Sequence, residues 1–117
     1  MLQQASQLRN VNGISKEDTQ RIEDFLQGAV YCWCKNNKGK WFSLRDLMGG
    51  DNFYWQRTPL MPLYHKHEID KGNPIKEAGK DAGWILKSVL ANDKREFESK
   101  KENLIRKYRW TLKEENT

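Results

Sequence analysis

Two cysteines and two histidines are the residues in this chain with the chemistry to hold a transition metal. They form the pairs Cys32-x-Cys34 and His65-x-His67, and four such ligands would complete the tetrahedral coordination that zinc prefers. Residues two apart on a helix point about 200° away from each other, whereas zinc ligands are usually spaced so that both reach one side. We therefore predict no metal site and no cofactor, with buried cysteines and partly exposed histidines.

The sequence patterns of known catalytic and nucleotide-binding loops do not occur in the chain. There is no G-x-S-x-G, no G-K-[ST] and no G-x-G-x-x-G, so neither a nucleophile elbow nor a phosphate-binding loop is indicated. Adjacent carboxylates such as Glu23-Asp24 fall in stretches typical of solvated helix faces. We expect the protein not to be an enzyme.

Positive charge is concentrated near the carboxyl end of the sequence. The 117 residues include 21 Lys and Arg against 16 Asp and Glu, which gives a net charge of +5. Residues 94–113 alone contain eight basic and three acidic side chains, also a net +5, so the rest of the chain is balanced. A surface that gathers cations in this way creates a field that attracts polyanions such as nucleic acids.

The length and composition of the chain indicate one domain. Compact domains of roughly 100–150 residues usually have a single core, and 37% hydrophobic residues suffice for a thin one. No apolar run approaches the roughly 20 residues that cross a bilayer, and residues 1–10 lack the apolar stretch of a secretion signal. We therefore expect a cytoplasmic protein with no membrane contact. Because there are only two cysteines, too few for a secreted disulfide framework, we expect their thiols to be reduced.

Hydroxyl caps and apolar periods predict three helices in the first part of the chain. Each follows a Ser or Thr that can accept a hydrogen bond from the first turn, and Pro59 fits the first position of the third helix. The three predicted helices begin after Ser15, Ser43 and Thr58, and they end near Asn36, Gly49 and Gly72 respectively.

A fourth helix is predicted to begin at Asn73-Pro74 by the same logic of a cap followed by proline. Its apolar period passes through Gly79 and Gly83, and small residues on a helix face favour close packing against a neighbour. The period continues weakly, so residues 74–110 form either one long helix or two. We favour a break near Asn92, which would leave a separate basic C-terminal helix.

The predicted fold is therefore mainly α, a single compact domain of four to five helices in helix-turn-helix-like order. The first and fourth helices would form the core pair, and one short extended segment is allowed at Lys40–Phe42. We expect residues 1–13 to be a flexible arm, residues 14–113 the helical domain with its basic C-terminal helix, and residues 114–117 a polar tail.

Element order and charge together predict a small, non-catalytic nucleic-acid-binding protein with an accessory or regulatory role, and DNA is the expected partner. The helix after Thr58 would enter the major groove while the basic C-terminal helix contacts the phosphate backbone. The residues expected to bind are Arg57, Thr58, His65, Lys66, Lys94, Arg95, Lys100, Lys101, Arg106 and Lys107.

The consecutive aromatic residues Phe53, Tyr54 and Trp55 support an alternative function. Three neighbouring rings cannot all point inward, so at least one is expected on the surface. An exposed Tyr or Trp beside Arg57 is typical of protein-binding hot spots, and it would also suit stacking on an unpaired base. The chain is therefore also consistent with a protein-interaction module or subunit that uses this aromatic segment and the last helix, or with a homodimer. The dimer seam on the last helix would consist of Phe97, Leu104, Ile105 and Tyr108.

Overall fold

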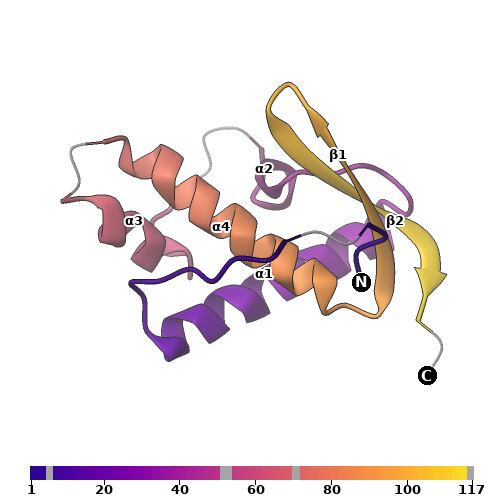
Figure 1. The fold of residues 1–117 in the computed structure, drawn as a ribbon, viewed down its shortest axis with the longest axis horizontal. Helices are drawn as coiled ribbons and strands as arrows, with labels where there is room; N and C mark the ends of the chain where they lie inside the picture. Colours follow the sequence, from indigo (N-terminus) through magenta and orange to yellow (C-terminus); the bar gives the residue numbers. More distant parts are fainter. Residues whose placement is uncertain (5–6, 51–53, 70–71, 116–117) are drawn as a thin grey trace.

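In the residues that the structure describes, four helices are followed by a two-stranded hairpin (Figure 1). The computed structural model describes residues 1–4, 7–50, 54–69 and 72–115. The helices are α1 (Lys16–Asn36), α2 (Leu44–Leu47), α3 (Met61–His67) and α4 (Pro74–Ala91), and the strands are β1 (Arg95–Glu102) and β2 (Ile105–Glu114). The fold is therefore α+β, and the prediction of a mainly α fold is wrong.

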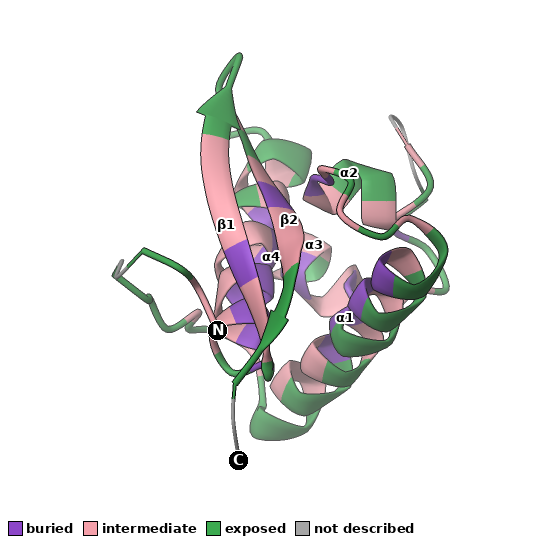
Figure 2. Ribbon diagram, turned by 90° about the vertical axis from the view of Figure 1, so that its right-hand side faces the viewer, coloured by how far each residue is buried: buried purple, intermediate pink, exposed green. Residues whose placement is uncertain are grey.

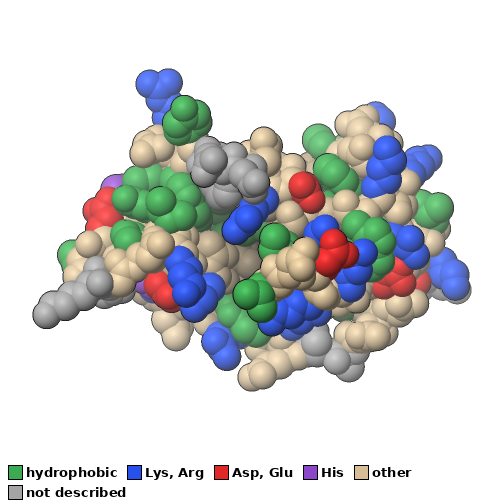
Figure 3. All heavy atoms as spheres, turned by 90° about the horizontal axis from the view of Figure 1, so that it is seen from above, with side chains coloured by type: hydrophobic (Ala, Val, Ile, Leu, Met, Phe, Trp, Pro, Cys, Tyr) green, Lys and Arg blue, Asp and Glu red, His purple; other side chains and the backbone are tan. Residues whose placement is uncertain are grey.

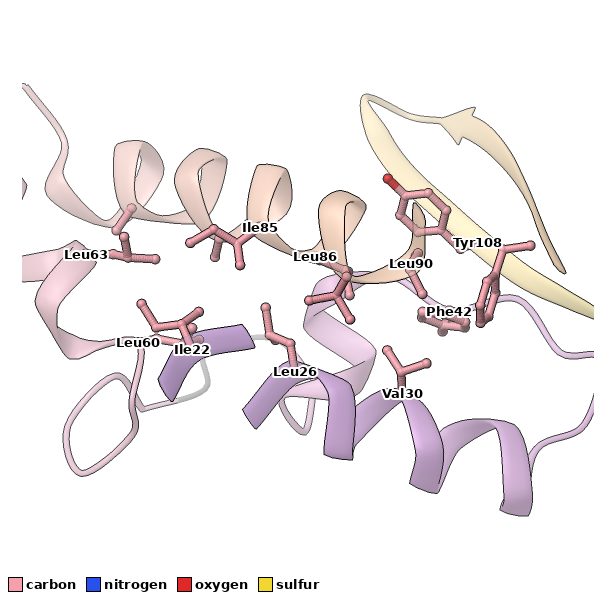
Figure 4. Close-up of a cluster of buried hydrophobic side chains, with 14 of the residues drawn as sticks. Ile22, Leu26, Val30, Phe42, Leu60, Leu63, Ile85, Leu86, Leu90 and Tyr108 are labelled. Atoms are coloured by element: carbon pink, nitrogen blue, oxygen red, sulfur yellow. The ribbon is translucent and has the colours of Figure 1, made fainter. Parts of the chain in front are cut away.

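The core lies between α1 and α4, which confirms the predicted core pair (Figure 4). Both helices have an apolar face at helical spacing, and each large side chain that it buries contributes about 1.5–3 kcal/mol relative to an exposed one. The buried residues of the two helices are Ile22, Leu26, Val30 and Cys34 on α1 and Ala78, Ala82, Ile85, Leu86, Val89 and Leu90 on α4.

Three of the predicted helix caps are present. The Ser15 hydroxyl accepts a hydrogen bond from the amide of Asp18, at 3.0 Å, and α1 begins at Lys16, directly after Ser15. Ser43 and Asp46 form a reciprocal capping box on α2, in which each side chain accepts a hydrogen bond from the other's backbone amide. The Asn73 side chain caps α4, with Pro74 at the first helical position. These local signals placed the helix starts correctly because capping is decided within one turn.

The predicted basic C-terminal helix is instead the hairpin of β1 and β2. The strands are antiparallel, with Glu102 opposite Ile105 and a two-residue turn between them. Phe97 and Tyr108 are buried on the side that faces the helices, while the hairpin tip is exposed (Figure 2). Phe97 and Tyr108 are eleven residues apart, a spacing that also fits a helix, but here they share a face because the chain reverses between them. With this helix absent and both rings buried, the predicted dimer seam does not exist.

Two extended segments add to the edges of the hairpin. The Phe42 amide donates to the Tyr108 carbonyl and its carbonyl accepts from the Tyr108 amide, each at 2.8 Å. On the other edge, the Gln3 amide donates to the Phe97 carbonyl at 2.7 Å and the Phe97 amide donates to the Met1 carbonyl at 2.8 Å. The short extended segment expected at Lys40–Phe42 is therefore present, and residues 1–3 of the predicted arm are hydrogen-bonded to β1.

The two helices that suggested a helix-turn-helix order, α2 and α3, do not have the geometry of that motif. α2 has four residues, and residues 48–60 separate it from α3, far more than the three or four residues of a strict turn. Thr58 does not cap α3 directly. Its hydroxyl accepts from the Leu60 amide and donates to the Trp55 carbonyl, so it closes the turn before the helix.

Among the described residues, no helix has the length and apolar character needed to cross a bilayer.

Candidate functional site

The cations of the hairpin divide between its two faces because side chains alternate along a strand. Lys100 is paired with Lys107 in the register, and the next pair towards the tip is Lys101 with Arg106. Residues directly opposite each other share a face, so the first pair lies on the outer face and the second on the side of the helices. The predicted binding residues of this segment therefore belong to two different surfaces.

On the outer face, carboxylates neutralise the cations. Lys100 and Lys107 each place Nζ 3.1 Å from a carboxylate oxygen of Glu102, and hydrogen bonds from these two lysines lower the pKa of that carboxyl. The Arg109 guanidinium pairs with Glu98 on the opposite strand. This face has the character of an ordinary ion-paired surface.

Trp41 completes this outer face. Lys100 Nζ lies 4.4 Å and the Arg109 guanidinium carbon 5.0 Å from the centre of its indole ring. These contacts arise because Trp41 precedes Phe42, which pairs with β2 and points to the core. The outer face is thus held together by contacts within the protein, and its cations Lys100, Lys107 and Arg109 are each paired with a carboxylate.

On the opposite side, the hairpin tip forms one wall of a groove of about 1100 Å³. The other walls come from α4 and α2, and the buried residues Trp55 and Tyr108 also line it. Among the described residues that line it, six are basic and none is acidic. Figure 3, which looks onto the hairpin tip, shows Lys and Arg side chains on this face, with hydrophobic side chains and some Asp and Glu side chains among them. The basic residues of the groove are Arg45, Lys76, Lys80, Lys87, Lys101 and Arg106.

One stripe of α4 forms the longest wall of this basic groove. Lys76, Lys80 and Lys87 occur at i, i+4 and i+11, with Gly79 and Gly83 between them, and these spacings place all five residues on one side of the helix. A methyl group built on either glycine would meet nothing within 4 Å. The expectation that these glycines mark close packing against a neighbour is therefore wrong, since they leave helix backbone open to the groove.

Most of the groove's charge is not compensated. In the described part of the chain, Lys76, Lys87, Lys101 and Arg106 form no ion pair with a carboxylate within 4.0 Å, while Lys80 lies 3.5 Å from Glu77 outside the groove lining. Burial, together with the nearby charge of Arg106, lowers the pKa of Lys87. Like charges are therefore held facing each other across the groove, an arrangement that a bound anion would relieve.

The predicted residues around α3 lie away from the hairpin, at the opposite end of the molecule (Figure 1). Arg57 is exposed and has a left-handed backbone, with φ of 66°. His65 Nδ1 lies 3.2 Å from Glu68, and Lys66 Nζ lies 2.9 Å from Asp81 on α4. The structure therefore does not bring the two predicted groups together on one surface.

Asp81 links α3 to α4. Its Oδ2 atom lies 2.9 Å from Lys66 Nζ and 2.8 Å from His67 Nε2, and all three side chains are less than a quarter exposed. Beside them, the Arg9 guanidinium lies 4.6 Å from the centre of the Trp84 ring, whose other neighbour is Lys87 at 5.0 Å. Lys66 is thus occupied in holding the fold together, and Trp84 contacts Arg9 beside this cluster while it also lines the basic groove.

Two further predicted residues, Lys94 and Arg95, lie where α4 passes into the hairpin. The Arg95 guanidinium is 2.7 Å from the buried carboxylate of Asp93, and its carbon lies 5.8 Å above the Tyr31 ring. Lys94 is exposed. Arg95 is therefore committed to the internal packing of the hairpin base.

The aromatic segment divides as its sequence suggested. Tyr54 is 82% exposed, whereas Trp55 is buried and its ring centre lies 6.4 Å from that of Tyr64. Phe53 lies outside the described residues. Of the two described residues predicted to bind a partner, only Tyr54 presents its ring to solvent.

The cysteines and histidines are far apart in the fold. Cys32 is exposed on α1, while Cys34 is buried, and burial raises the pKa of its thiol to about 11. His65 and His67 belong to α3. Within the described ranges, no group of three or more His, Cys, Asp and Glu side chains is placed to bind a metal ion.

Sequence reasoning missed four of the six basic groove residues, which are Arg45, Lys76, Lys80 and Lys87. The segment 94–113 attracted attention because its net charge is high, whereas the lysines of α4 alternate with Glu77 and Asp81, which point to other sides of the helix. Projection of the charges onto a helical wheel would have found the stripe.

Comparison with protein families, with curated proteins and with solved structures finds no match to this chain.

Proposed function

We propose that this protein binds nucleic acid in the basic groove between α4, α2 and the hairpin tip, as a non-catalytic accessory or regulatory factor. The observation that supports this proposal is the lining of the groove, which has six basic side chains and no acidic one among the described residues. Phosphate contacts of this kind supply most of the affinity of non-specific nucleic-acid binding.

The contrast between the two faces of the hairpin argues against a merely solvated surface. On the outer face, Lys100 and Lys107 share the carboxylate of Glu102. On the groove face, Lys101 and Arg106 oppose each other and have no acidic partner in the described part of the chain. Like charges directly opposite on a hairpin destabilise it, so the groove face has a charge arrangement that folding alone does not favour.

The length of the charged stripe favours a polymer over a small anion. Lys76 and Lys87 are eleven residues apart, which corresponds to roughly 16 Å along the helix. A nucleic-acid strand in a duplex carries one phosphate per roughly 3.4 Å of helix axis. The stripe therefore spans several phosphates, and Lys101 and Arg106 add charge on the facing wall.

The two register pairs of the hairpin provide a matched experiment. The double variants Lys101→Gln/Arg106→Gln and Lys100→Gln/Lys107→Gln each remove two positive charges from neighbouring positions on the same strands. Fluorescence anisotropy with a labelled 20-nucleotide DNA across a salt series would compare them. We expect the groove variant to lose roughly tenfold or more in affinity and to flatten the salt slope by about 1.5, and the outer-face variant to change much less.

Equal losses for both double variants would show that only net charge matters and would contradict the groove as the site. An affinity of the parent protein that does not fall as salt rises would contradict nucleic-acid binding itself.

A protein-interaction module is the second candidate, and the exposed ring of Tyr54 is the observation that favours it. Its predicted last helix is absent and Trp55 is buried, so the candidate surface is reduced to the neighbourhood of Tyr54. In the same anisotropy titration, Tyr54→Ala should leave DNA affinity unchanged if the groove is the binding site. A large loss for this variant would move the site to the aromatic segment.

A further inference from the structure

The basic groove also contains apolar side chains that the fold does not use. Leu104 at the hairpin tip is 88% exposed and Ile75 in the first turn of α4 is 58% exposed, and both belong to the groove lining. Large apolar side chains are common on protein surfaces one at a time. Here two of them line a groove whose six charged side chains, among the described residues, are all cationic, so the groove combines charge with apolar contact.

Leu104 occupies a backbone position that leucine disfavours. It is the second residue of the two-residue turn, with φ of 65°, and Asn103 before it has φ of 51°. Turns with two positive φ angles normally use Asn, Asp or Gly, because other side chains are strained in the left-handed region. An exposed, strained leucine gives the hairpin no stability, and at this position its side chain also lines the groove.

The floor between these apolar side chains is open. Gly79 and Gly83 present α4 backbone to the groove, and a methyl group at either position would have nothing within 4 Å. Trp84 lies on the same stretch of helix and also lines the groove. A flat ring can approach this floor more closely than it could approach a helix covered by side chains.

We infer that the basic groove receives a single nucleic-acid strand with unpaired bases in preference to a double helix. A duplex presents phosphates outward and keeps its base faces stacked inside, so it offers little to Leu104 and Ile75. A single strand presents phosphates and base faces together, which matches cations interleaved with apolar surface. The groove volume of about 1100 Å³ lies just above the range of roughly 300–1,000 Å³ for small-molecule clefts, which leaves room for a short run of nucleotides.

This inference rests on the proposed function, and a second strained leucine supplies the control for its test. Leu112 on β2 also has a left-handed backbone, with φ of 72°, and is 57% exposed, but it does not belong to the groove lining. Asn tolerates positive φ, so Leu104→Asn and Leu112→Asn should both fold and should both raise the thermal midpoint. Only the first variant removes an apolar side chain from the groove.

The experiment is an anisotropy titration at one salt concentration with two probes, a labelled 15-nucleotide oligothymidine and a labelled 15-base-pair duplex. We expect the parent protein to bind the single strand at least tenfold more tightly than the duplex. Leu104→Asn should weaken single-strand binding about fivefold, the loss expected when one leucine no longer makes a partly buried contact. Ile75→Gln should act in the same direction, and Leu112→Asn should match the parent.

The single-strand inference would be overturned if the parent protein bound the duplex as tightly as the single strand, or more tightly, and if Leu104→Asn and Leu112→Asn had the same affinity for the single strand. The proposed function would still stand. Displacement of the oligothymidine by polyglutamate at equal charge concentration would also overturn the inference, because it would indicate an acidic protein partner. If neither probe bound with an affinity that falls as salt rises, both the inference and the proposed function would be wrong.

Discussion

Lys101 of β1 and Arg106 of β2 lie directly opposite each other in the hairpin register, one pair away from the turn. Each cation sits in the other's field, so the free energy of unfolding of the hairpin should rise when one of them is neutralised. We predict that Lys101→Thr stabilises the protein by about 0.2–1 kcal/mol, measured by urea unfolding, while it weakens nucleic-acid binding.

Lys100→Thr is the control for this substitution. It removes a lysine from the neighbouring position, but one that pairs with Glu102 at 3.1 Å. Its effect on the free energy of unfolding should therefore be zero or slightly destabilising. If Lys101→Thr destabilised the protein as much as Lys100→Thr, the repulsion assigned to the groove face would be wrong.

Gly83 and Gly28 allow stability and binding to be separated. Both are helical, and a methyl group at either would meet nothing within 4 Å. Alanine should therefore increase the free energy of unfolding by about 0.5–1 kcal/mol at each position, since glycine costs a helix interior that amount. Only Gly83 lines the basic groove, so only Gly83→Ala should also reduce affinity for single-stranded DNA.

Thermal unfolding and the anisotropy titration would measure the two effects. An affinity loss for Gly28→Ala would show that helix stiffening, and not the floor of the groove, controls binding. A destabilised Gly83→Ala would show that the open space above this glycine is smaller than the structure indicates.

The parts of the fold that sequence predicted are those decided within a few residues. Ser15, Ser43 and Asn73 each identify a helix start because their side chains bond to amides two or three positions ahead. The hairpin was not predicted because its evidence is non-local: Phe97 and Tyr108 share a face only after the chain has reversed. The turn itself was hidden, since Asn103-Leu104 lacks the glycine that usually marks it.

The candidate site was predicted only in part for the same reason. Lys101 and Arg106 were identified from the charge of their segment, but the expected helix did not show that they lie on a different face from Lys100 and Lys107. In the hairpin, side chains alternate between the two faces of each strand, and this alternation places the two pairs on opposite faces. The lysines of α4 join the site through tertiary structure, and a net charge counted along the chain does not reveal which of them share a wall with the hairpin tip.

Asp93 is the buried charge on which the base of the hairpin depends. Its carboxylate accepts hydrogen bonds from the Gln27 side chain at 2.9 Å, from the Arg95 amide at 2.9 Å and from the Arg95 guanidinium at 2.7 Å. We predict that Asp93→Ala lowers the free energy of unfolding by about 3 kcal/mol, because it leaves a partly buried guanidinium without its partner.

Urea unfolding would measure this loss against Glu77→Ala, which breaks an exposed ion pair with Lys80 at 3.5 Å and should cost less than about 0.5 kcal/mol. Similar small losses for both variants would indicate that Arg95 is satisfied by water, and that α1 and the hairpin base are held together by apolar packing alone.

Alkaline pH should unfold the protein through Cys34 and Tyr108. Burial raises the pKa of the Cys34 thiol from 9.0 to about 11 and that of the Tyr108 phenol from 10.0 to about 12. Both groups lose their protons more readily when unfolded, so their stabilising effect is complete below pH 9 and declines as pH rises towards 12. Burial lowers the pKa of Lys87, so this side chain has the opposite effect and makes the free energy of unfolding rise with pH.

Urea unfolding from pH 8 to pH 12 should show stability falling, and Tyr108→Phe should reduce the fall above pH 10 by an amount on the order of 2 kcal/mol. Tyr31→Phe, at a ring that is 52% exposed, is the control and should leave the profile unchanged. A parent profile that stays flat above pH 9 would mean that the phenol and thiol are more hydrated than their burial indicates.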